Sequence, residues 1–279
     1  METTIRELLA QAETLLRDGG SARLDAELLL GIVLDKDRSY FYSHPETTIS
    51  ATDYADYYSL ISKRQSGYPV AYLMGKREFW SMELQVTRHT LIPRPETERL
   101  VEAALEYIPP DSVMRILDLG TGSGAIALAI ARERPVCKVT AVDVSREALN
   151  VARMNAERLQ LTNVELRQSD WFTGLSGELF DLIVSNPPYV ESDHIGFERE
   201  TIRFEPRLAL DGGHHGLLAI QQIIPAARRH LHEGGYLLLE HGNTQGNDIR
   251  NLLALHHYKD IMSLCDYAGL ERVTLGRFV

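Results

Sequence analysis

The turn Asn186-Pro187-Pro188-Tyr189 combines residue types that can hold an amino group. It follows residues 180–184, an apolar run of strand length, and the strand must end there because proline donates no hydrogen bond to a sheet and fixes its own φ. The residue before each proline is also biased toward extended backbone. The turn therefore presents the Asn186 amide oxygen and backbone carbonyls, which accept hydrogen bonds from an –NH2 group, beside the aromatic ring of Tyr189. An ordinary turn opened by Asn-Pro is the alternative interpretation.

A second motif places glycine at positions 120, 122 and 124, directly after another apolar run. Glycines allow positive φ and close approach of the backbone to a ligand. Asp143 ends the next strand-like run, 23 residues after Gly120, where a carboxylate can accept from both ribose hydroxyls of a nucleoside. NAD, FAD and S-adenosylmethionine all fit these features. The dinucleotide fingerprint, however, is Gly-x-Gly-x-x-Gly, and Asp118 before this loop would repel a pyrophosphate but suits a cationic amino-acid end, so the pattern favours S-adenosylmethionine.

Strands and helices alternate from Met114 onward, which predicts a mostly parallel sheet. In open sheets of this kind ligands bind at the carboxyl ends of the strands, which is where both motifs and Asp143 lie. Gly234-Gly235 is interpreted as the turn before the fifth strand. The last two strands are joined by a short turn without a helix, so they must be antiparallel. The predicted strands are 115–119, 138–142, 163–166, 180–184, 236–240, 258–264 and 271–275.

The chain is expected to divide into three parts. Residues 1–75 carry apolar residues at helical spacing without strand-like alternation, which predicts a small domain of four or five helices. Residues 76–92 alternate like strands and include aromatic residues, so we expect a β-hairpin linker. Residues 93–279 form the third part, with a helix at 97–107 before the first strand. The predicted fold class is α/β: a Rossmann-like, mostly parallel sheet with the last strand antiparallel, a helical N-terminal domain and a β-hairpin connector.

The composition limits the classes of protein that fit. The 29 Lys and Arg against 39 Asp and Glu give a formal net charge of -10, which argues against a large non-specific nucleic-acid surface. We expect no signal peptide, because the N-terminus lacks a basic segment followed by an apolar one. No run approaches the ~20 apolar residues that span a bilayer. These features predict a soluble, cytoplasmic protein with no membrane contact and no direct nucleic-acid partner.

No metal site is expected. The histidine pairs lack cysteine or carboxylate partners at ligand spacing. They are His214-His215, His230 with His232, and His256-His257. Cys137 and Cys265 lie far apart and form no Cys-x-x-Cys pair, so we expect two buried free thiols in a reducing compartment. Ser123 and Ser185 lack a recognisable base and orienting acid, which excludes a serine hydrolase site.

The sheet pattern resembles the class I, S-adenosylmethionine-dependent methyltransferases. Residues 118–124 match their first motif, Asp143 their ribose-binding acid, and residues 186–189 their amino-group-methylating signature. Three further stretches, together with the helical N-terminal domain, resemble the peptide-chain release factor glutamine methyltransferases over nearly the whole chain. These stretches are residues 22–30, 92–98 and 205–210. One departure is the loop 211–216, Asp-Gly-Gly-His-His-Gly, where the family more usually has Asp before the last Gly, so its role is open.

The resemblance implies methyl transfer from S-adenosyl-L-methionine to the side-chain nitrogen of the glutamine in a Gly-Gly-Gln tripeptide of a release factor, with S-adenosyl-L-homocysteine as product. Asn186 and the Pro187 carbonyl would be catalytic, and Pro188 and Tyr189 would join them in binding the substrate. Trp171 would line the adenine pocket beside Asp170, although ordinary packing at a strand end is the alternative for both. The implied cofactor-binding residues are Gly120, Thr121, Gly122, Ser123, Gly124, Asp143, Trp171 and Asn186.

Other functions fit parts of the same pattern. Ribosomal-protein glutamine methyltransferases share the Asn-Pro-Pro-Tyr turn, but we would not expect the Pro-Arg-Pro-Glu-Thr-Glu of residues 93–98 from them. A DNA adenine amino-methyltransferase predicts a basic target-recognition region, whereas the N-terminal domain is mixed in charge. A cofactor-binding interaction protein without turnover would tolerate loss of Asn186.

Overall fold

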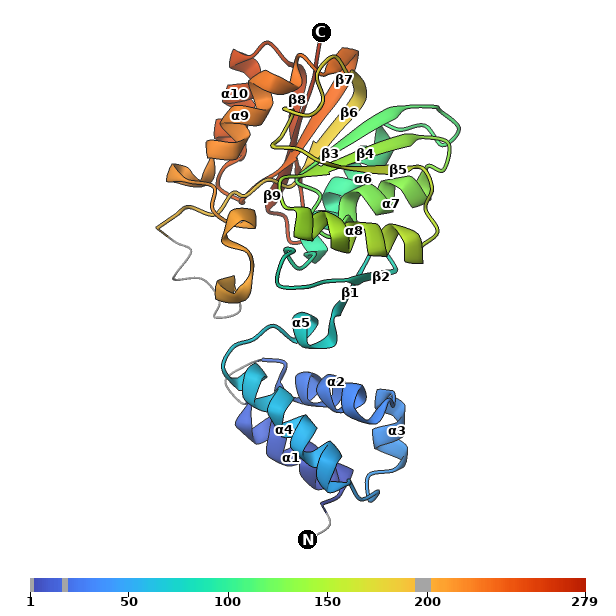
Figure 1. Ribbon diagram of the computed structural model, residues 1–279. Helices are drawn as coiled ribbons and strands as arrows, with labels where there is room; N and C mark the ends of the chain where they lie inside the picture. Colours follow the sequence, from blue (N-terminus) through green and yellow to red (C-terminus); the bar gives the residue numbers. More distant parts are fainter. Residues whose placement is uncertain (1–2, 17–19, 194–201) are drawn as a thin grey trace. The chain divides into compact units, whose positions relative to one another are not determined.

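The computed structural model describes residues 3–16, 20–193 and 202–279. It divides the chain into two units, Met1–Lys76 and Arg77–Val279 (Figure 1). The first unit is helical, whereas the second is built on a sheet with helices on both faces.

The first unit is held together by the apolar faces of its helices. Isoleucines and leucines recur at helical spacing on the first, second and fourth helices, and they form one buried core around Tyr57. The helices of its described part are α1 (Ile5–Leu15), α2 (Ala22–Leu34), α3 (Arg38–Ser43), α4 (Ala51–Gln65) and α5 (Val70–Met74).

Two acidic residues on α2 are buried in this unit and are paired. Glu27 accepts hydrogen bonds from Arg23 and Arg38, each at 2.7 Å, and one from the Tyr42 hydroxyl at 3.0 Å. Asp25 accepts from Arg64 at 2.7 Å. Buried carboxylates require such partners, because an unpaired charge in the interior is costly. The buried carboxylates of the stretch 22–30 are therefore satisfied by partners on α2, α3 and α4.

A β-hairpin of β1 (Lys76–Phe79) and β2 (Met82–Gln85) leads into the sheet. Its turn residues Trp80 and Ser81 both have positive φ, 52° and 51°, as a two-residue hairpin turn requires. Glu98 and Glu133 hold this turn, since they accept the Trp80 backbone and indole N–H groups at 2.8 and 3.0 Å. Apolar hairpin side chains join the core beneath the sheet, so the hairpin packs within the second unit.

The sheet follows the predicted topology. Its order is β5-β4-β3-β6-β7-β9-β8, in which β3 to β7 are parallel and the last strand, β9, is antiparallel to both neighbours. This confirms the predicted class of fold. The strands are β3 (Arg115–Leu119), β4 (Lys138–Asp143), β5 (Val164–Gln168), β6 (Phe180–Ser185), β7 (Leu231–Glu240), β8 (Lys259–Cys265) and β9 (Glu271–Arg277).

The prediction of a turn at Gly234-Gly235 was wrong, because both glycines lie inside β7. The register against β6 shifts between Phe180 and Leu182, and this irregularity accommodates them. A Cβ atom on Gly235 would lie 2.9 Å from the Asp181 carbonyl oxygen. Gly235 thus permits a close approach of β6 and β7, although a Gly-Gly pair in the sequence suggests a turn.

Helices cover both faces of the sheet and separate its core into two layers. The helices on one face are α6 (Glu98–Glu106), preceded by the short helix η1 (Pro95–Thr97), α7 (Ala125–Glu133) and α8 (Arg146–Arg158). Those on the other face are α9 (Leu218–Ala227) and α10 (Gly246–Leu255) (Figure 1). Short 3-10 helices at Ile202–Phe204, Arg207–Ala209 and His214–Gly216 connect β6 to α9.

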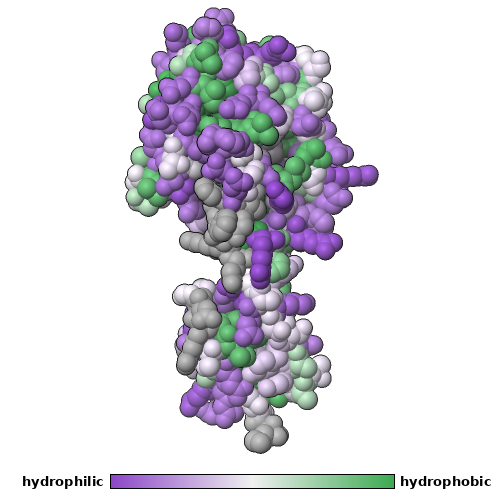
Figure 2. Space-filling view, turned by 90° about the vertical axis from the view of Figure 1, so that its left-hand side faces the viewer, coloured by the Kyte–Doolittle hydropathy of each residue, from purple (hydrophilic) through white to green (hydrophobic). Residues whose placement is uncertain are grey.

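The surface is mostly polar on the face shown in Figure 2, where apolar side chains gather in separate small areas of the second unit. Among the described residues, no helix is both long enough and apolar enough to cross a membrane. Cys137 is buried, as expected, but Cys265 is exposed because it ends β8 at the edge of the sheet. The prediction of two buried thiols was therefore wrong for Cys265.

Candidate active site

Asn186 follows the end of β6, between two cavities. Ser185, the last residue of the strand, donates its hydroxyl to the Leu119 carbonyl at 2.8 Å and so joins the carboxyl ends of β6 and β3. The first cavity has a volume of about 430 Å³ and the second about 730 Å³. Asn186 lines both, together with Leu91 and Ala209. A molecule in one cavity can therefore meet a molecule in the other beside the Asn186 side chain.

The first cavity contains the residues expected around a nucleoside. Gly120, Asp143, Asp170 and Trp171 line it. The Asp143 carboxylate is oriented, since one oxygen accepts the Gly122 N–H at 2.9 Å and the other the Ser145 N–H at 2.8 Å. Burial raises the pKa of Asp143, while these backbone hydrogen bonds lower it in part. Each oxygen keeps further acceptor capacity that a diol can use.

The remaining residues of the glycine loop do not line this cavity. Thr121 is buried and donates its hydroxyl to Asp118 at 2.6 Å, and the Ser123 carbonyl accepts from Asn155 at 2.9 Å. Gly124 precedes α7 with a φ of 87°, and a Cβ there would lie 2.9 Å from Leu128. The side-chain and backbone contacts of these residues lie on the interior side of the loop. Within residues 120–124, Gly120 is the residue that lines the cavity.

Asp118 is fully buried beneath the loop. Its Oδ2 accepts from Thr121 and from the Ala127 N–H, whereas Oδ1 has no hydrogen-bond partner among the described residues. Burial and, to a smaller extent, the nearby Asp143 raise its pKa to about 7, although the two hydrogen bonds act in the opposite direction. A buried acceptor without a partner is a group that a cationic N–H of a ligand could satisfy.

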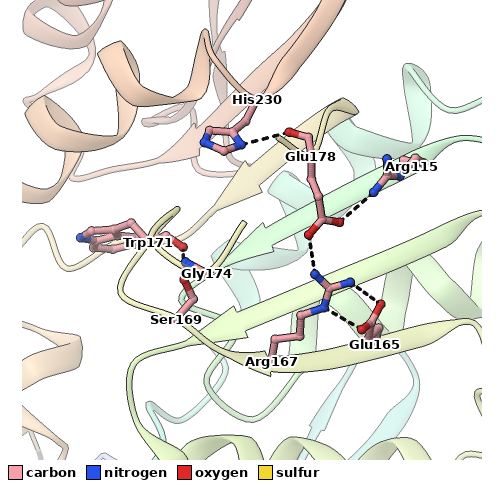
Figure 3. Close-up of polar contacts among 8 residues, drawn as sticks. All are labelled: Arg115, Glu165, Arg167, Ser169, Trp171, Gly174, Glu178 and His230. Atoms are coloured by element: carbon pink, nitrogen blue, oxygen red, sulfur yellow. Dashed lines mark hydrogen bonds and ion pairs between the residues drawn. The ribbon is translucent and has the colours of Figure 1, made fainter. Parts of the chain in front are cut away.

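The loop that carries Trp171 is tied at both ends (Figure 3). At its start, the Ser169 hydroxyl donates to the Trp171 carbonyl at 2.8 Å and accepts the Gly174 N–H at 3.0 Å. At its end, the Glu178 carboxylate pairs with Arg167 at 2.5 Å and Arg115 at 2.9 Å.

The Trp171 backbone has a φ of 47°, an uncommon value for an aromatic residue. Its indole points away from the ion pairs of Glu178 (Figure 3). A Cβ on Gly120 would lie 3.7 Å from the ring, so the indole closes over the glycine loop. The anchored ends of the loop hold this strained backbone in place, as is common at binding sites.

The other residues of the proline turn differ in what they face. Tyr189 lines the second cavity, Pro188 lines the first, and Pro187 is buried and lines neither. The Tyr189 hydroxyl donates to Glu240 at 3.2 Å, and burial raises the pKa of this tyrosine above its usual range. Its carbonyl accepts the Gln245 side-chain N–H at 3.1 Å.

The loop 211–216, whose role the sequence left open, packs directly against this turn. A Cβ on Gly216 would lie 2.1 Å from the Tyr189 carbonyl oxygen, and one on Gly212 would lie 2.8 Å from the Pro188 carbonyl oxygen. The Gly212 N–H also donates to the Val190 carbonyl at 2.8 Å. The loop thus supports the turn from behind, and its glycines permit that contact.

Sequence reasoning missed several residues that hold the site. Glu205 is 6% exposed, accepts the Ile92 N–H at 3.0 Å and pairs with Arg94 at 2.5 Å. This contact joins two of the stretches used for the resemblance, 92–98 and 205–210. Thr97 accepts the Asn186 Nδ2–H at 3.2 Å. Glu205 and Thr97 both lie close to prolines in the sequence, which marks the two stretches. The sequence does not show which residues these side chains contact.

No group of three or more His, Cys, Asp and Glu side chains is arranged to hold a metal ion in the parts of the chain that the structure describes. The histidine pair of the loop 211–216 is instead associated with Glu191, which lies 3.3 Å from His215.

A family model described as a methyltransferase domain matches residues 110–271, and one described as the PrmC N-terminal domain matches residues 7–75. A release factor glutamine methyltransferase of Salmonella typhimurium is 48% identical over 97% of this chain and 97% of its own length. One of Pseudomonas aeruginosa is 47% identical over 99% of both chains. The chain belongs to the release factor glutamine methyltransferase family.

The family and the class of enzyme predicted from the motifs are therefore confirmed. The fold is shared more widely. A solved methyltransferase from Pyrococcus furiosus is 23% identical and aligns with a TM-score of 0.52 over 71% of this chain and 88% of that chain.

Proposed function

We propose that this chain methylates the side-chain amide nitrogen of the glutamine in the Gly-Gly-Gln motif of peptide-chain release factors, using S-adenosyl-L-methionine. The observation that carries the proposal is that Asn186 lines two adjoining cavities, one of which contains the features expected for a nucleoside. The full-length similarity to release factor glutamine methyltransferases supports the choice of substrate.

The residues of the first cavity fit the cofactor. Asp143 is oriented to accept from the ribose hydroxyls, Trp171 offers an aromatic face to the adenine, and Gly120 lets the backbone approach the methionine part. The buried Oδ1 of Asp118, without a partner among the described residues, suits a cationic amino group. When bound, S-adenosylmethionine supplies an electrophilic methyl group on a sulfonium.

Asn186 and Pro187 would orient the glutamine amide. The Pro188 carbonyl lies against Gly212, and the Tyr189 carbonyl already accepts from Gln245. The Asn186 side chain lines both cavities, whereas Pro187 lines neither, so the role of the Pro187 carbonyl is proposed from the resemblance. Accepting from both amide hydrogens would aim the nitrogen lone pair and stabilise the positive charge that develops there. Two such charge-assisted hydrogen bonds contribute on the order of 1.5–3 kcal/mol each.

Positioning is the main task of these residues, because an amide nitrogen is a poor nucleophile. Holding the reactants in line supplies at most roughly 7–11 kcal/mol of the barrier. Neither acceptor is a good base, so the leaving proton departs to water after methylation. We assign no general base. Asn186 and Pro187 are the proposed catalytic residues, and Pro188 and Tyr189 complete the wall around the substrate.

The helical unit is the candidate for gripping the protein substrate, because a tripeptide alone offers little area for specificity. We therefore propose residues 1–75 as the recognition domain, 76–92 as the linker and 93–279 as the methyltransferase domain. The proposed partners are the release factors, with no nucleic acid or membrane, and such a substrate implies a cytoplasmic location.

Mass spectrometry of release factors incubated with the enzyme and S-adenosylmethionine tests the proposal. The expected product is one additional methyl group on the glutamine of Gly-Gly-Gln. Asn186→Ala should lower kcat by about 10²–10³-fold, the usual loss for a group that stabilises developing charge. Asn150→Ala, at an exposed position of α8, is the matched control and should retain full activity. Methylation of duplex DNA or a ribosomal protein, with release factors unmodified, would show the proposal to be wrong.

A further inference from the structure

Gln245 precedes α10 directly and lines the second cavity, and three segments of the chain meet at its side chain. Its Nε2 donates to the Tyr189 carbonyl at 3.1 Å and to the His215 carbonyl at 3.0 Å. Its Oε1 accepts the Gly242 N–H at 2.8 Å. These partners belong to the proline turn after β6, to the loop 211–216 and to the segment after β7. Gln245 is only 9% exposed, so water competes little for these hydrogen bonds.

The backbone groups around Gln245 fix the direction of its amide. A carbonyl only accepts hydrogen bonds and a backbone N–H only donates, so the NH2 must face Tyr189 and His215. A reversed amide would place its oxygen against two carbonyl oxygens. Both side-chain N–H groups are therefore occupied, and Gln245 has no donor left for a substrate. Its place at the cavity is that of a support.

The Gly242 end of this contact is anchored to the sheet. The Gly242 carbonyl lies 2.8 Å from Nδ1 of His241, which is fully buried. Nε2 of His241 lies 2.7 Å from the hydroxyl of Thr274 on β9. Because a carbonyl can only accept, Nδ1 carries the proton and Nε2 accepts from Thr274. Burial lowers the pKa of His241, which favours this neutral form. The segment that bonds the oxygen of the Gln245 amide is therefore fixed by the sheet.

We infer that Gln245 is a positioning residue for methyl transfer: by holding the Tyr189 carbonyl, it sets the position of Asn186 beside the two cavities. Two prolines separate Tyr189 from Asn186, and each fixes its own φ and restricts the residue before it. A displacement at Tyr189 is therefore carried to Asn186. On the other side, the Asn186 side chain donates to Thr97 at 3.2 Å. This inference rests on the proposed function of Asn186.

A replacement of similar length tests the inference. Gln245→Met removes both N–H groups, and kcat with an intact release factor should fall about 10- to 100-fold, as expected for a misplaced reactive group. The affinity for S-adenosylmethionine, measured by calorimetry, should stay within about threefold, because Gln245 does not line the first cavity. Gln221→Met, at an exposed position of α9, is the matched control and should keep full activity.

Gln245→Glu should add a signature in the pH dependence. An ionised carboxylate facing two carbonyls bonds neither, whereas the protonated acid can donate to one. Burial and the carbonyls should raise the pKa of the introduced carboxyl. The ratio of kcat in Gln245→Glu to kcat in Gln245→Met should therefore rise about fivefold from pH about 8 to about 6, as one hydrogen bond is restored.

Other ionisable side chains do not account for such a rise, because both variants retain them and their titration cancels in the ratio. Those on the segments that meet at Gln245, and on β9 beside them, are Tyr189, Glu191, Asp211, His214, His215, Glu240, His241, Asp248, Arg250, Glu271 and Arg272. His215 lies 3.3 Å from Glu191, and Glu271 pairs with Arg250 at 2.9 Å.

The side-chain amide signals of Gln245 in 15N-labelled protein report the contact without any substrate. They are assigned by their absence from the spectrum of Gln245→Glu. Both protons should exchange with solvent more slowly than those of the exposed Gln221, because each is bonded to a carbonyl.

Four results would overturn the inference. They are exchange of either Gln245 proton as fast as in Gln221, full activity of Gln245→Met, a loss of cofactor affinity in Gln245→Met as large as its loss of kcat, and a constant ratio of kcat between the two variants at all pH values. If the Gln245 protons are protected but the unaltered enzyme methylates no release factor, the contact is supported and the proposed function fails.

Discussion

Asp118 illustrates how a single buried side chain can make the stability of the fold depend on pH. The residue is completely buried, and its Oδ1 has no hydrogen-bond partner in the described parts of the chain. Burial raises its pKa to about 7, so the ionised form is disfavoured in the folded state. Relative to the unfolded chain, the group therefore stabilises the fold most at low pH, and this stabilisation is lost as the pH rises through about 7.

Asp118→Asn should remove this dependence on pH. The quantity to compare is the unfolding temperature of the variant minus that of the unaltered chain, both without cofactor. This difference should be more positive near pH 8 than near pH 5, because only the unaltered chain loses stability as Asp118 ionises, by about 1.4 kcal/mol for each unit of pKa shift. Thermal unfolding at the two pH values measures the change. The same substitution should weaken binding of S-adenosylmethionine, which calorimetry detects. A difference in unfolding temperature that is the same at both pH values would contradict the assignment.

At the scale of elements, the site depends on segments that pack behind the proline turn. The loop 211–216 touches the carbonyls of Pro188 and Tyr189, and Gln245 at the start of α10 donates to the Tyr189 and His215 carbonyls. The turn is therefore rigid because of its neighbours as well as its prolines.

Gly216→Ala tests this support. The new Cβ would lie 2.1 Å from the Tyr189 carbonyl oxygen, so the turn must move, and kcat should fall at least about 100-fold, as for displacement of a reacting group by roughly 1 Å. Gly269→Ala is the matched control, because Gly269 also has a positive φ, of 81°, but its Cβ would meet nothing within 4 Å. Both variants carry backbone strain, and only the first should lose activity. Equal losses in methylation assays would assign the effect to strain alone.

The sequence revealed the parts of the site that are local in the chain. Asn186 and Asp143 each follow an apolar run directly, so their place at the carboxyl ends of strands could be predicted. Thr97 and Glu240 could not be, because they lie 89 and 51 residues from their partners Asn186 and Tyr189, and only the order of strands brings them together. Thr121 was expected at the cofactor but turns inward, since its hydroxyl satisfies Asp118. The sequence motifs indicate which backbone positions lie near a ligand. The direction of each side chain depends on hydrogen-bond partners that are distant in the sequence or become clear only in the folded loop.

At the scale of the whole molecule, the two units have separate hydrophobic cores. The core of Met1–Lys76 is formed by its own helices, and that of Arg77–Val279 lies on the two faces of the sheet. Each unit therefore has the apolar packing that a stable domain requires.

Deletion of residues 1–75 should then separate two functions. The remaining chain should bind S-adenosylmethionine within about threefold of the full-length affinity, because the first cavity is lined by residues of the second unit alone. Methylation of an intact release factor should fall far more steeply, through a higher KM. Calorimetry and methylation assays measure the two effects. Unimpaired methylation by the shortened chain would exclude the helical unit from substrate recognition.

The meeting of two cavities at one asparagine also bears on inhibition. A compound that fills only the second cavity leaves the first open, so its potency should be insensitive to the concentration of the methyl donor. A compound that joins an adenosine group to a carboxamide through a short tether would occupy both cavities and pass Asn186, which lines both. Selectivity over other enzymes with the same nucleoside pocket would come from the carboxamide arm.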